Sequence, residues 1–586
     1  MRKEKPNVFP HVIPDIKDWP IFQLHLKRKQ FVKEIDDFAL QRIKNKFKKN
    51  LGDTIAKTAY MERIRIKEEP WKVDPQDERI FWKRIQKRLA SVPVGTIPDE
   101  QVGEAYEQLL NKIIHRYSEE IVGTFRVSTF QFARQFLTFF FSRLLNAAAS
   151  PNFRGIYGSR YQLYERLIAT GEVEKVRSLM TKGTVVIVPT HFSNLDSILI
   201  GYVLDAVVGL PSFHYGAGLN LYNYSVAAYF MNRLGSYRLD RRKKSPIYLE
   251  VLKAMSTLAI SKGTNTLFFP GGTRSRAGAM EVKLKMGLLS TVVEAQRMLL
   301  EQGKSDKIFV VPMVLGYHVV LEANELIEQH LKRTGKERYI RTRKGIGALF
   351  SILSFVYKVF SQSSEITVSF GKPMDVVGNF VDEEGRSLDR FGNEVALRDY
   401  FISDNLVTED LQRESQYTRI LAERIVDRYF KENIVLSSHL VAFTAFEMLK
   451  RSNPKLDLFA LLRLPADDLA ISMADMIACV SQLQKTLYEM EAKGNIKLSE
   501  QIRWEPEKLI QDGIRQLGVY NSYKPLKINK KGIIVSQDFK LLFYYRNRLD
   551  HYKLEEAMEP FFQGWKGIPE LDEEERNEPI GEEQNP

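Results

Sequence analysis

The sequence predicts an α/β protein: a mixed, largely parallel sheet flanked by helices, with helical N- and C-terminal regions on either side of it in the chain. Two observations lead to this prediction, namely short apolar runs rich in β-branched residues and longer segments of helical periodicity between them. The apolar runs lie at 184–190, 264–270, 308–316 and 365–371. Alternation of this kind favours parallel strands connected by helices.

These patterns divide the chain into four expected regions. They are an N-terminal helical region at 1–150, an α/β domain at 151–400, a C-terminal helical region at 401–567 and a tail at 568–586. We expect the tail to be disordered because it is acidic and poor in apolar residues.

Two segments of the N-terminal region carry distinct helical patterns. In 26–49, apolar residues recur at roughly helical intervals among many charges. The segment 125–149 is aromatic and apolar on nearly all sides. For this second segment we favour a buried helix over one that contacts a membrane.

The composition indicates a folded protein with anionic partners. Of 586 residues, 44% are hydrophobic and 27% charged, which suits two or three domains and excludes disorder of the whole chain. The net charge of +13 favours nucleic acid, phosphorylated metabolites or an anionic membrane face as partners. Cys479 is the single cysteine, which excludes a disulfide scaffold and a cysteine zinc cluster.

Neither a secretory signal nor a transmembrane segment is expected. The N-terminus lacks the apolar stretch of a signal peptide. The longest uncharged run, 206–232, contains Pro211, three glycines and three asparagines, and is too broken for a lipid-facing helix.

The first candidate for chemistry follows the predicted strand at 184–190. His191 lies just past its carboxyl end, where open α/β sheets bind ligands. Ser193 or Asn194 is expected to cap the next helix, so that Asp196 lies in its first turn and leans back toward His191. A carboxylate on one ring nitrogen would leave the other free as a base. The alternative is a turn histidine with an aspartate that complements the helix dipole.

Two cationic segments follow downstream. Five of the seven residues at 238–244 are basic, which suits either anion binding or a solvated turn. In 268–278, two glycines precede Arg274 and Arg276, and residues two apart in an extended segment point to the same side. Both guanidiniums could therefore hold one phosphate, for which their planar fork is suited, or lie in a surface turn by chance. The spacing of a nucleotide P-loop is absent.

Taken in order, four blocks resemble the glycerolipid acyltransferase superfamily. The first is the His-x4-Asp block HFSNLD, the second GSYRLDR, the third FPGGTRSR and the fourth VVPMVLGY; they lie at 191–196, 235–241, 269–276 and 310–317. Four further segments point to the glycerol-3-phosphate acyltransferase branch, at 218–221, 317–337, 366–373 and 544–549. This resemblance implies the glycerol-3-phosphate acyltransferase-like version of the fold.

The chain departs from the family pattern at two positions. Arg238 lies where the second block usually has an apolar residue. Gly271 replaces the usual glutamate of the third block, Phe-Pro-Glu-Gly-Thr-Arg-Ser-Arg. The second departure bears on the identity of the acceptor, although the soluble plastid enzymes of this branch resemble Pro-x-Gly-Gly with two arginines.

The resemblance implies transfer of a fatty acyl group from acyl-CoA or acyl-ACP to the sn-1 hydroxyl of glycerol 3-phosphate, the first step of phospholipid synthesis. His191 would be the base and Asp196 would orient it. Arg241, Arg274 and Arg276 would hold the phosphate. Backbone N–H groups of Gly271 and Gly272 are possible oxyanion donors.

Direct transfer without cofactor or metal is expected. No Gly-x-Ser-x-Gly elbow, His-Glu-x-x-His run or cysteine pair is present in the sequence. The alternatives are a 1-acylglycerol-3-phosphate or dihydroxyacetone-phosphate acyltransferase, and a degenerate acyltransferase fold that binds lipid or protein. Nucleic acid is not expected as a partner, because aromatic residues do not interleave with the basic runs.

A membrane surface is a further expected partner. Residues 331–345 carry seven basic residues and one acidic residue, and 347–360 is apolar but too short to span a bilayer. Such a pair suits an interfacial helix on an anionic leaflet, although a core helix behind a solvated loop has the same pattern. We therefore expect a peripheral protein on the cytoplasmic face of the membrane.

Overall fold

Most of the chain is described by the structure, a computed structural model. The described residues are 8–93, 98–149, 167–219, 222, 225–333, 365–464, 470–519, 523–563 and 565, with the backbone alone at 140–149 and 225–227. The predicted tail at 568–586 lies outside them. So does 334–360, which makes up most of the segment in which we expect membrane contact.

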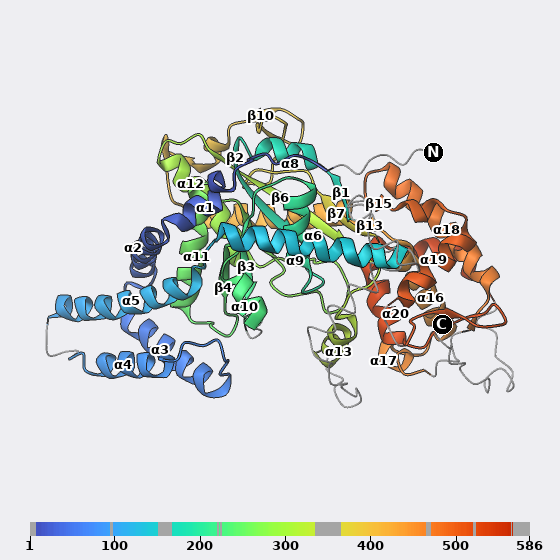
Figure 1. Cartoon of the computed structure of the whole chain (residues 1–586), viewed down its shortest axis with the longest axis horizontal. Coiled ribbons are helices and arrows are strands. Elements are labelled where there is room, and N and C mark those ends of the chain that lie inside the picture. Colours follow the sequence, from blue (N-terminus) through green and yellow to red (C-terminus); the bar gives the residue numbers. More distant parts are fainter. Residues whose placement is uncertain are drawn as a thin grey trace.

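A seven-stranded sheet lies at the centre of the molecule, in the order β1-β7-β6-β2-β5-β3-β4 (Figure 1). The strands are β1 (Leu167–Gly171), β2 (Gly183–Pro189), β3 (His214–Gly218), β4 (Ser236–Leu239), β5 (Thr266–Leu267), β6 (Lys307–Gly316) and β7 (Ile366–Phe370). Only the β6–β7 pair is antiparallel among these neighbours. The predicted α/β fold with a largely parallel sheet is confirmed.

Burial explains which strands the sequence predicts. β2, β6 and β7 match their apolar runs within one residue at each end, and β6 is almost wholly buried along its length. The run at 264–270 forms only the two-residue strand β5, since the chain turns at Pro270. β1, β3 and β4 are short and contain glycine or polar residues, so they lack the apolar signal.

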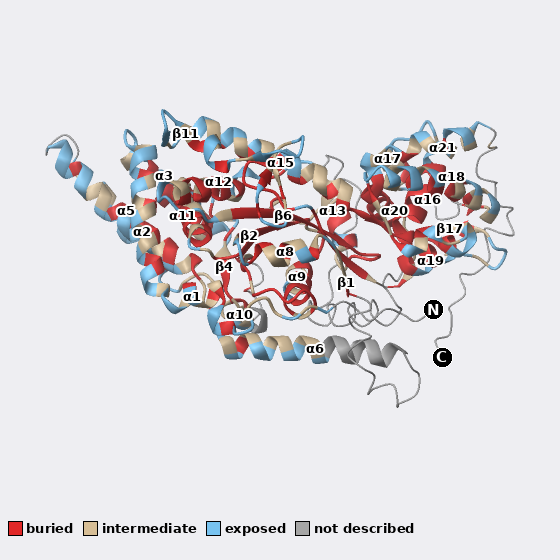
Figure 2. Cartoon of the chain, turned by 90° about the horizontal axis from the view of Figure 1, so that it is seen from above, coloured by how far each residue is buried: buried red, intermediate tan, exposed pale blue. Residues whose placement is uncertain are grey.

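Helices cover both faces of the sheet (Figure 2). One face carries α11 (Pro246–Ser261), α12 (Met286–Glu301) and α15 (Leu411–Glu432), and the other carries α8 (Val173–Leu179) and α9 (Asp196–Tyr202). Helix α9 continues as a π-helical turn at Val203–Val207. Local sequence sets where these helices begin: Ser245 accepts a hydrogen bond from the Tyr248 amide, and Pro246 is the first residue of α11.

The N-terminal helices form a second core beside the sheet. They are α1 (Pro20–Leu26), α2 (Arg28–Phe47), α3 (Leu51–Glu68), α4 (Glu78–Ala90) and α5 (Asp99–Ile121). Ile35 of α2 and Ile113 of α5 share one buried cluster with Val251 of α11. Helix α11 therefore belongs to both cores and joins this region to the α/β domain.

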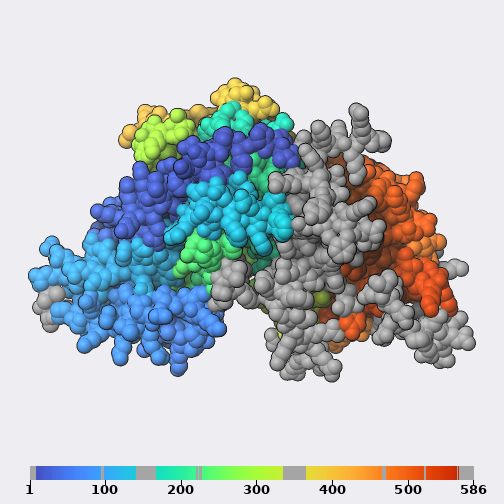
Figure 3. Space-filling view, in the orientation of Figure 1, coloured from blue at the N-terminus to red at the C-terminus, as the bar shows by residue number. Residues whose placement is uncertain are grey.

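Helix α6 (Val127–Ala149) crosses the surface on the same side as α9 (Figures 1 and 3). Phe132, Phe136 and Phe139 are exposed to 56%, 49% and 60%. The prediction of a buried helix at 125–149 is therefore wrong for this face. The side chain of Thr138 bonds the Tyr202 hydroxyl, so only the opposite face of α6 packs on the protein.

The C-terminal helices extend the main core. They are α16 (Ser437–Ser452), α17 (Leu458–Leu461), α18 (Met473–Ala492), α19 (Pro506–Gly518), α20 (Phe539–Arg546) and α21 (Leu554–Phe562). One continuous buried cluster includes Val310 of β6, Phe443 of α16 and Leu542 of α20. This region is thus packed against the α/β domain without an intervening gap in the core.

The remaining described elements are short connections around these layers. The helices are α10 (Ser225–Met231) and α13 (Ala323–Arg333). The strands are β8 (Phe380–Val381), β9 (Ser387–Leu388), β10 (Glu394–Val395), β11 (Ile402–Ser403), β12 (Leu406–Val407), β13 (Ile434–Val435), β14 (Ala470–Ile471), β15 (Lys497–Leu498), β16 (Lys527–Ile528) and β17 (Ile534–Val535). Of these, α13 begins close to the site described next.

Candidate active site

His191 and Asp196 form a hydrogen-bonded pair at the carboxyl end of β2. The distance from His191 Nδ1 to Asp196 Oδ2 is 2.8 Å. Asp196 is fully buried as the first residue of α9. Its Oδ2 also accepts the amides of Phe192 and Ser193, and the Tyr317 hydroxyl donates to its Oδ1 at 2.8 Å. The two carboxylate oxygens therefore accept these bonds in a fixed position.

This pairing determines which nitrogen of His191 is available. A carboxylate at Nδ1 favours the tautomer that has its proton there, which leaves Nε2 as an acceptor. Nε2 has no hydrogen-bond partner among the described residues, and the side chain is 12% exposed. The ring stacks on Phe269 with centroids 4.1 Å apart. His191 can thus act as a base toward a group that approaches Nε2.

The prediction that Ser193 or Asn194 caps the N-terminus of α9 is wrong. The residue before α9 is Leu195, and no side chain caps the helix. Ser193 Oγ instead donates to Glu322 Oε2 at 2.8 Å, while the Asn194 amide donates to Glu322 Oε1. The carboxylate of Asp196 takes the two amides of the turn, so the cap that Ser193 would supply is not needed.

Arg274, Arg276 and Arg241 come together beside this pair. Arg274 forms an ion pair of 3.1 Å with Glu322, the carboxylate that also holds Ser193. Burial, followed by the charges of Arg274 and Arg276, lowers the pKa of Arg241. Burial and then the charges of Arg333 and Arg274 lower the pKa of Arg276. Cations that repel one another in this way favour binding of an anion.

The basic run 238–244 separates into different roles. Arg242 contacts Asp240 and Asp74 at 2.7 Å and 2.5 Å and is largely buried. Lys243 is buried and hydrogen-bonded to Glu120, which ties the run to the N-terminal helices. The solvated-turn alternative is wrong for both residues. Arg241 keeps exposed surface, although the protein around its guanidinium removes enough water to lower its pKa. Within the described part of the chain it has no ion-pair partner.

Arg238, one of the two departures from the family blocks, is also engaged locally. Its guanidinium donates to Asn232 Oδ1 at 2.6 Å and 3.1 Å. It lies 5.3 Å from the centre of the Tyr222 ring. Arg238 therefore occupies a position usual for an apolar residue by packing on an aromatic ring and pairing with an amide.

The two glycines of the third block differ in what they offer. Gly272 has a φ of +76°, and its N–H donates to Phe269 O at 3.0 Å. That amide is occupied by the turn and is a poor oxyanion donor. No backbone partner is found for the Gly271 amide among the described residues. Gly271 is the better candidate of the two.

The C-terminal region contacts the first block, the fourth block and the residue that follows the third block. Arg548 is buried, donates to Leu315 O at 2.6 Å and lies 4.2 Å from the centre of the Phe192 ring. Burial lowers its pKa to about 10. Asn547 Nδ2 donates to Ala277 O at 2.9 Å. The conformation of these three segments thus depends on residues more than two hundred positions away.

Sequence reasoning did not assign a role to four residues of the site. They are Tyr317, Glu322, Glu281 and Arg548. Tyr317 ends the fourth block, while Glu322 and Arg548 lie in segments used for the resemblance alone. Glu281 is ten residues past Gly271 and belongs to no block. Nothing local in the sequence marks these contacts, because each joins distant segments.

Comparison with known proteins agrees with the blocks. Residues 170–316 match the family model described as Acyltransferase. A glycerol-3-phosphate acyltransferase of Aeromonas hydrophila is 27% identical over 274 residues, 46% of this chain and 29% of that protein. One of Pseudoalteromonas atlantica is 28% identical over 219 residues, 37% of this chain and 25% of that protein. One of Pseudomonas syringae pv. tomato is 25% identical over 329 residues, 56% of this chain and 34% of that protein.

The matched stretch thus spans about a third or less of the length of these curated relatives. The predicted resemblance to glycerolipid acyltransferases is confirmed, and the match to the acyltransferase model lies in residues 170–316.

Proposed function

We propose that this protein transfers a fatty acyl group from an acyl thioester, acyl-CoA or acyl-ACP, to the sn-1 hydroxyl of glycerol 3-phosphate. The observation that carries the proposal is the free Nε2 of His191, set by buried Asp196 and placed beside three arginines. One site thereby combines a base with a phosphate-binding group.

The reaction follows from this arrangement. His191 Nε2 takes the hydroxyl proton as the oxygen attacks the thioester carbonyl carbon. The C–O bond forms and the C–S bond then breaks, and the leaving sulfur takes the proton back from the imidazolium as a free thiol. A positioned base contributes roughly 10²–10⁴-fold to such a step. The Gly271 amide is a candidate donor to the oxyanion.

The arginines supply specificity for a phosphate. Arg241 and Arg276 retain donors for an anion, and Arg274 links the phosphate site to the first block through Glu322. Planar guanidiniums bind phosphate oxygens in pairs. Holding the phosphate there places the far end of a three-carbon acceptor toward His191.

Thiol release from purified protein tests this function. The protein is incubated with acyl-CoA or acyl-ACP and with glycerol 3-phosphate, dihydroxyacetone phosphate or 1-acylglycerol 3-phosphate in turn. We expect release with glycerol 3-phosphate, loss of release in His191→Ala, and full release in the control His115→Ala, a histidine exposed to 61%. Release with another acceptor alone would reassign the substrate. No release with any acceptor would favour a lipid- or protein-binding module.

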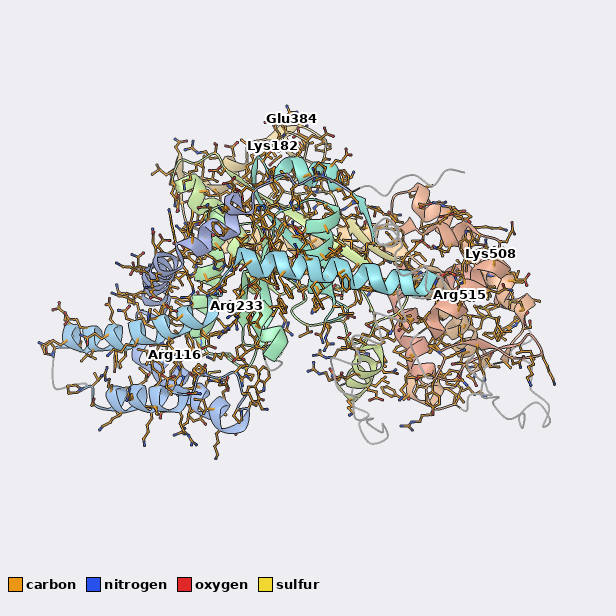
Figure 4. All side chains as sticks on the ribbon, viewed as in Figure 1. Arg116, Lys182, Arg233, Glu384, Lys508 and Arg515 are labelled. Carbon is orange, nitrogen blue, oxygen red and sulfur yellow. The ribbon has the colours of Figure 1, made fainter. Side chains whose placement is uncertain are left out.

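We further propose peripheral binding to the cytoplasmic face of a membrane. The aromatic face of α6 continues onto Tyr229 of α10, which is exposed to 50%, and Phe132 stacks on Phe230. Arg233, labelled in Figure 4, lies over the Tyr229 ring at 4.0 Å from its centre. Its backbone carbonyl accepts a hydrogen bond from the Arg126 amide. Exposed aromatic rings bordered by arginines suit an anionic interface. Within the residues described, every helix is too short or too polar to cross a membrane.

Vesicle co-sedimentation tests this surface. The double variant Phe132→Ser/Phe136→Ser is expected to bind vesicles of phosphatidylglycerol and phosphatidylcholine at least about tenfold more weakly. Burial of each ring in the membrane interface would contribute roughly 1.5–3 kcal/mol to the free energy of binding. Phe391→Ser, a ring exposed to 74% on a distant loop, is the control. Equal binding of all three proteins would contradict the assignment.

A further inference from the structure

Glu281 has a carboxyl group in the candidate site that the proposed reaction does not use. Its Oε1 accepts the His191 amide at 3.0 Å. Its Oε2 is buried and, among the described residues, has no hydrogen-bond partner. Burial raises the pKa of this group to about 8 against the opposing effects of the His191 amide and Arg548. A buried carboxyl with one free oxygen is costly, and groups of this kind gather at functional sites.

The carboxylate of Glu281 fills the space beside Gly271. A Cβ built on Gly271 would lie 2.8 Å from Glu281 Oε1 and 3.0 Å from its Cγ. A side chain at 271 would therefore displace the carboxyl group of Glu281 from its present position. Gly271 does not have the positive φ that its neighbour Gly272 has. The glycine at 271 therefore leaves room for the present position of Glu281, and the backbone conformation does not require it.

The same position explains the departure of the third block from its family pattern. The usual block has a glutamate where this chain has Gly271, and its side chain would start in the space that the carboxylate of Glu281 occupies. A main-chain hydrogen bond helps to bring Glu281 into the space of the usual glutamate, since the Lys285 amide donates to Pro270 O at 2.8 Å. That bond folds the segment containing Glu281 back onto the turn that contains Gly271.

We propose that Glu281 is a positioning residue, which supplies from position 281 the carboxyl group that the third block lacks at 271. It fixes the main chain of His191 against the Pro270–Gly272 turn, so that Nε2 faces the acceptor. This inference rests on the proposed function, because it assigns a role within the same reaction. It predicts that the carboxylate can be moved from one position to the other.

Relocation of the carboxylate provides the test. Glu281→Ala is expected to lower kcat for thiol release by about 10- to 100-fold, the effect of a displacement near 1 Å in a reacting group. The KM for glycerol 3-phosphate should change little, because the arginines remain. Gly271→Glu alone should also lose activity, since two carboxylates then compete for one space. The double variant Gly271→Glu/Glu281→Ala should regain at least about tenfold in kcat over Glu281→Ala.

Rescue by the double variant is a result that a merely structural carboxylate would not give. Glu423→Ala removes an exposed glutamate of α15 and is the control, with unchanged kcat expected. The proposal is overturned if Glu281→Ala keeps most of its kcat, or if the double variant is no better than Glu281→Ala. Thermal unfolding of each variant identifies any that fails to fold, and Glu281→Ser, which also frees the space beside Gly271, then replaces Glu281→Ala.

A second measurement is independent of turnover. The rate at which diethyl pyrocarbonate modifies His191, followed by mass spectrometry, reports the position of the imidazole. We expect the rate to change in Glu281→Ala and to return toward the original value in the double variant. If the unaltered protein released no thiol with any acceptor, the proposed function would fail, whereas an unchanged modification rate in Glu281→Ala would refute the role of Glu281.

Discussion

Two adjacent arginines at the end of β4 should respond in opposite ways to removal. Arg241 is exposed, has no ion-pair partner within the described residues and experiences the charges of Arg274 and Arg276. Arg242 is bound to Asp240 and Asp74. If the three guanidiniums bind the acceptor phosphate, Arg241→Ala should weaken binding of the acceptor without lowering the stability of the fold. Arg242→Ala should lower the stability of the fold without weakening binding of the acceptor.

The expected magnitudes follow from these partners. A hydrogen bond to a charged group contributes about 1.5–3 kcal/mol, so Arg241→Ala should raise the KM for glycerol 3-phosphate by about 10- to 150-fold with a smaller change in kcat. Arg242→Ala leaves the carboxylate of Asp240, exposed to 2%, without its partner. Loss of one partner from a buried pair costs about 3–5 kcal/mol, which should appear as a lower Tm.

Steady-state thiol release and thermal unfolding of the same preparations separate these effects. Lys244 is an exposed cation of the same run, and Lys244→Ala should change neither the KM for glycerol 3-phosphate nor the Tm. An acceptor that has a hydroxyl and no phosphate, such as glycerol, should show no difference between Arg241→Ala and the original protein. The reasoning is refuted if Arg241→Ala leaves KM unaltered, or if Arg242→Ala raises KM as much as Arg241→Ala does.

Two further predictions concern the carboxylate of the first block and the buried histidines. Asp196→Asn replaces the carboxylate by an amide, whose NH₂ group cannot accept the hydrogen bonds that N–H and O–H groups now donate to Oδ1 and Oδ2. The kcat should therefore fall by about 10²–10⁴-fold with KM less affected, as measured by steady-state kinetics. Burial lowers the pKa of His25 and His318 to about 4, and the pKa values of His214 and His439 are also lowered by burial. Since the unfolded chain takes up these protons below about pH 6.5, each histidine with a pKa near 4 should remove about 2 kcal/mol of stability by pH 5. Denaturant unfolding from pH 7 to pH 5 checks this, and a flat profile would contradict it.

Local signals account for the parts of the structure that the sequence predicts. β2 and β6 are buried on both faces, so their apolar runs are unambiguous. The His-x4-Asp spacing brings His191 and Asp196 together because a helix starts directly after the strand. Edge strands such as β4 contain polar residues, and periodicity does not reveal them.

Helix α6 shows a different limit of sequence patterns. Its aromatic composition suits a core, yet three phenylalanines point outward. Apolar residues on all sides of a helix do not specify which side the protein covers. That information lies in the elements that pack against the helix, here Tyr202 and the carboxylate of Asp205, which pairs with Arg134.

The candidate site is built by more of the chain than the stretch that matches the family model, 170–316. Tyr317, which holds Asp196, follows that stretch directly, and Glu322 joins Arg274 to Ser193 from the start of α13. Arg548 reaches the backbone of Leu315 from the C-terminal region. A base acts efficiently only when its position is fixed to a fraction of an ångström. The rigidity of His191 therefore depends on packing of the C-terminal helices, which explains why those helices share one core with the sheet.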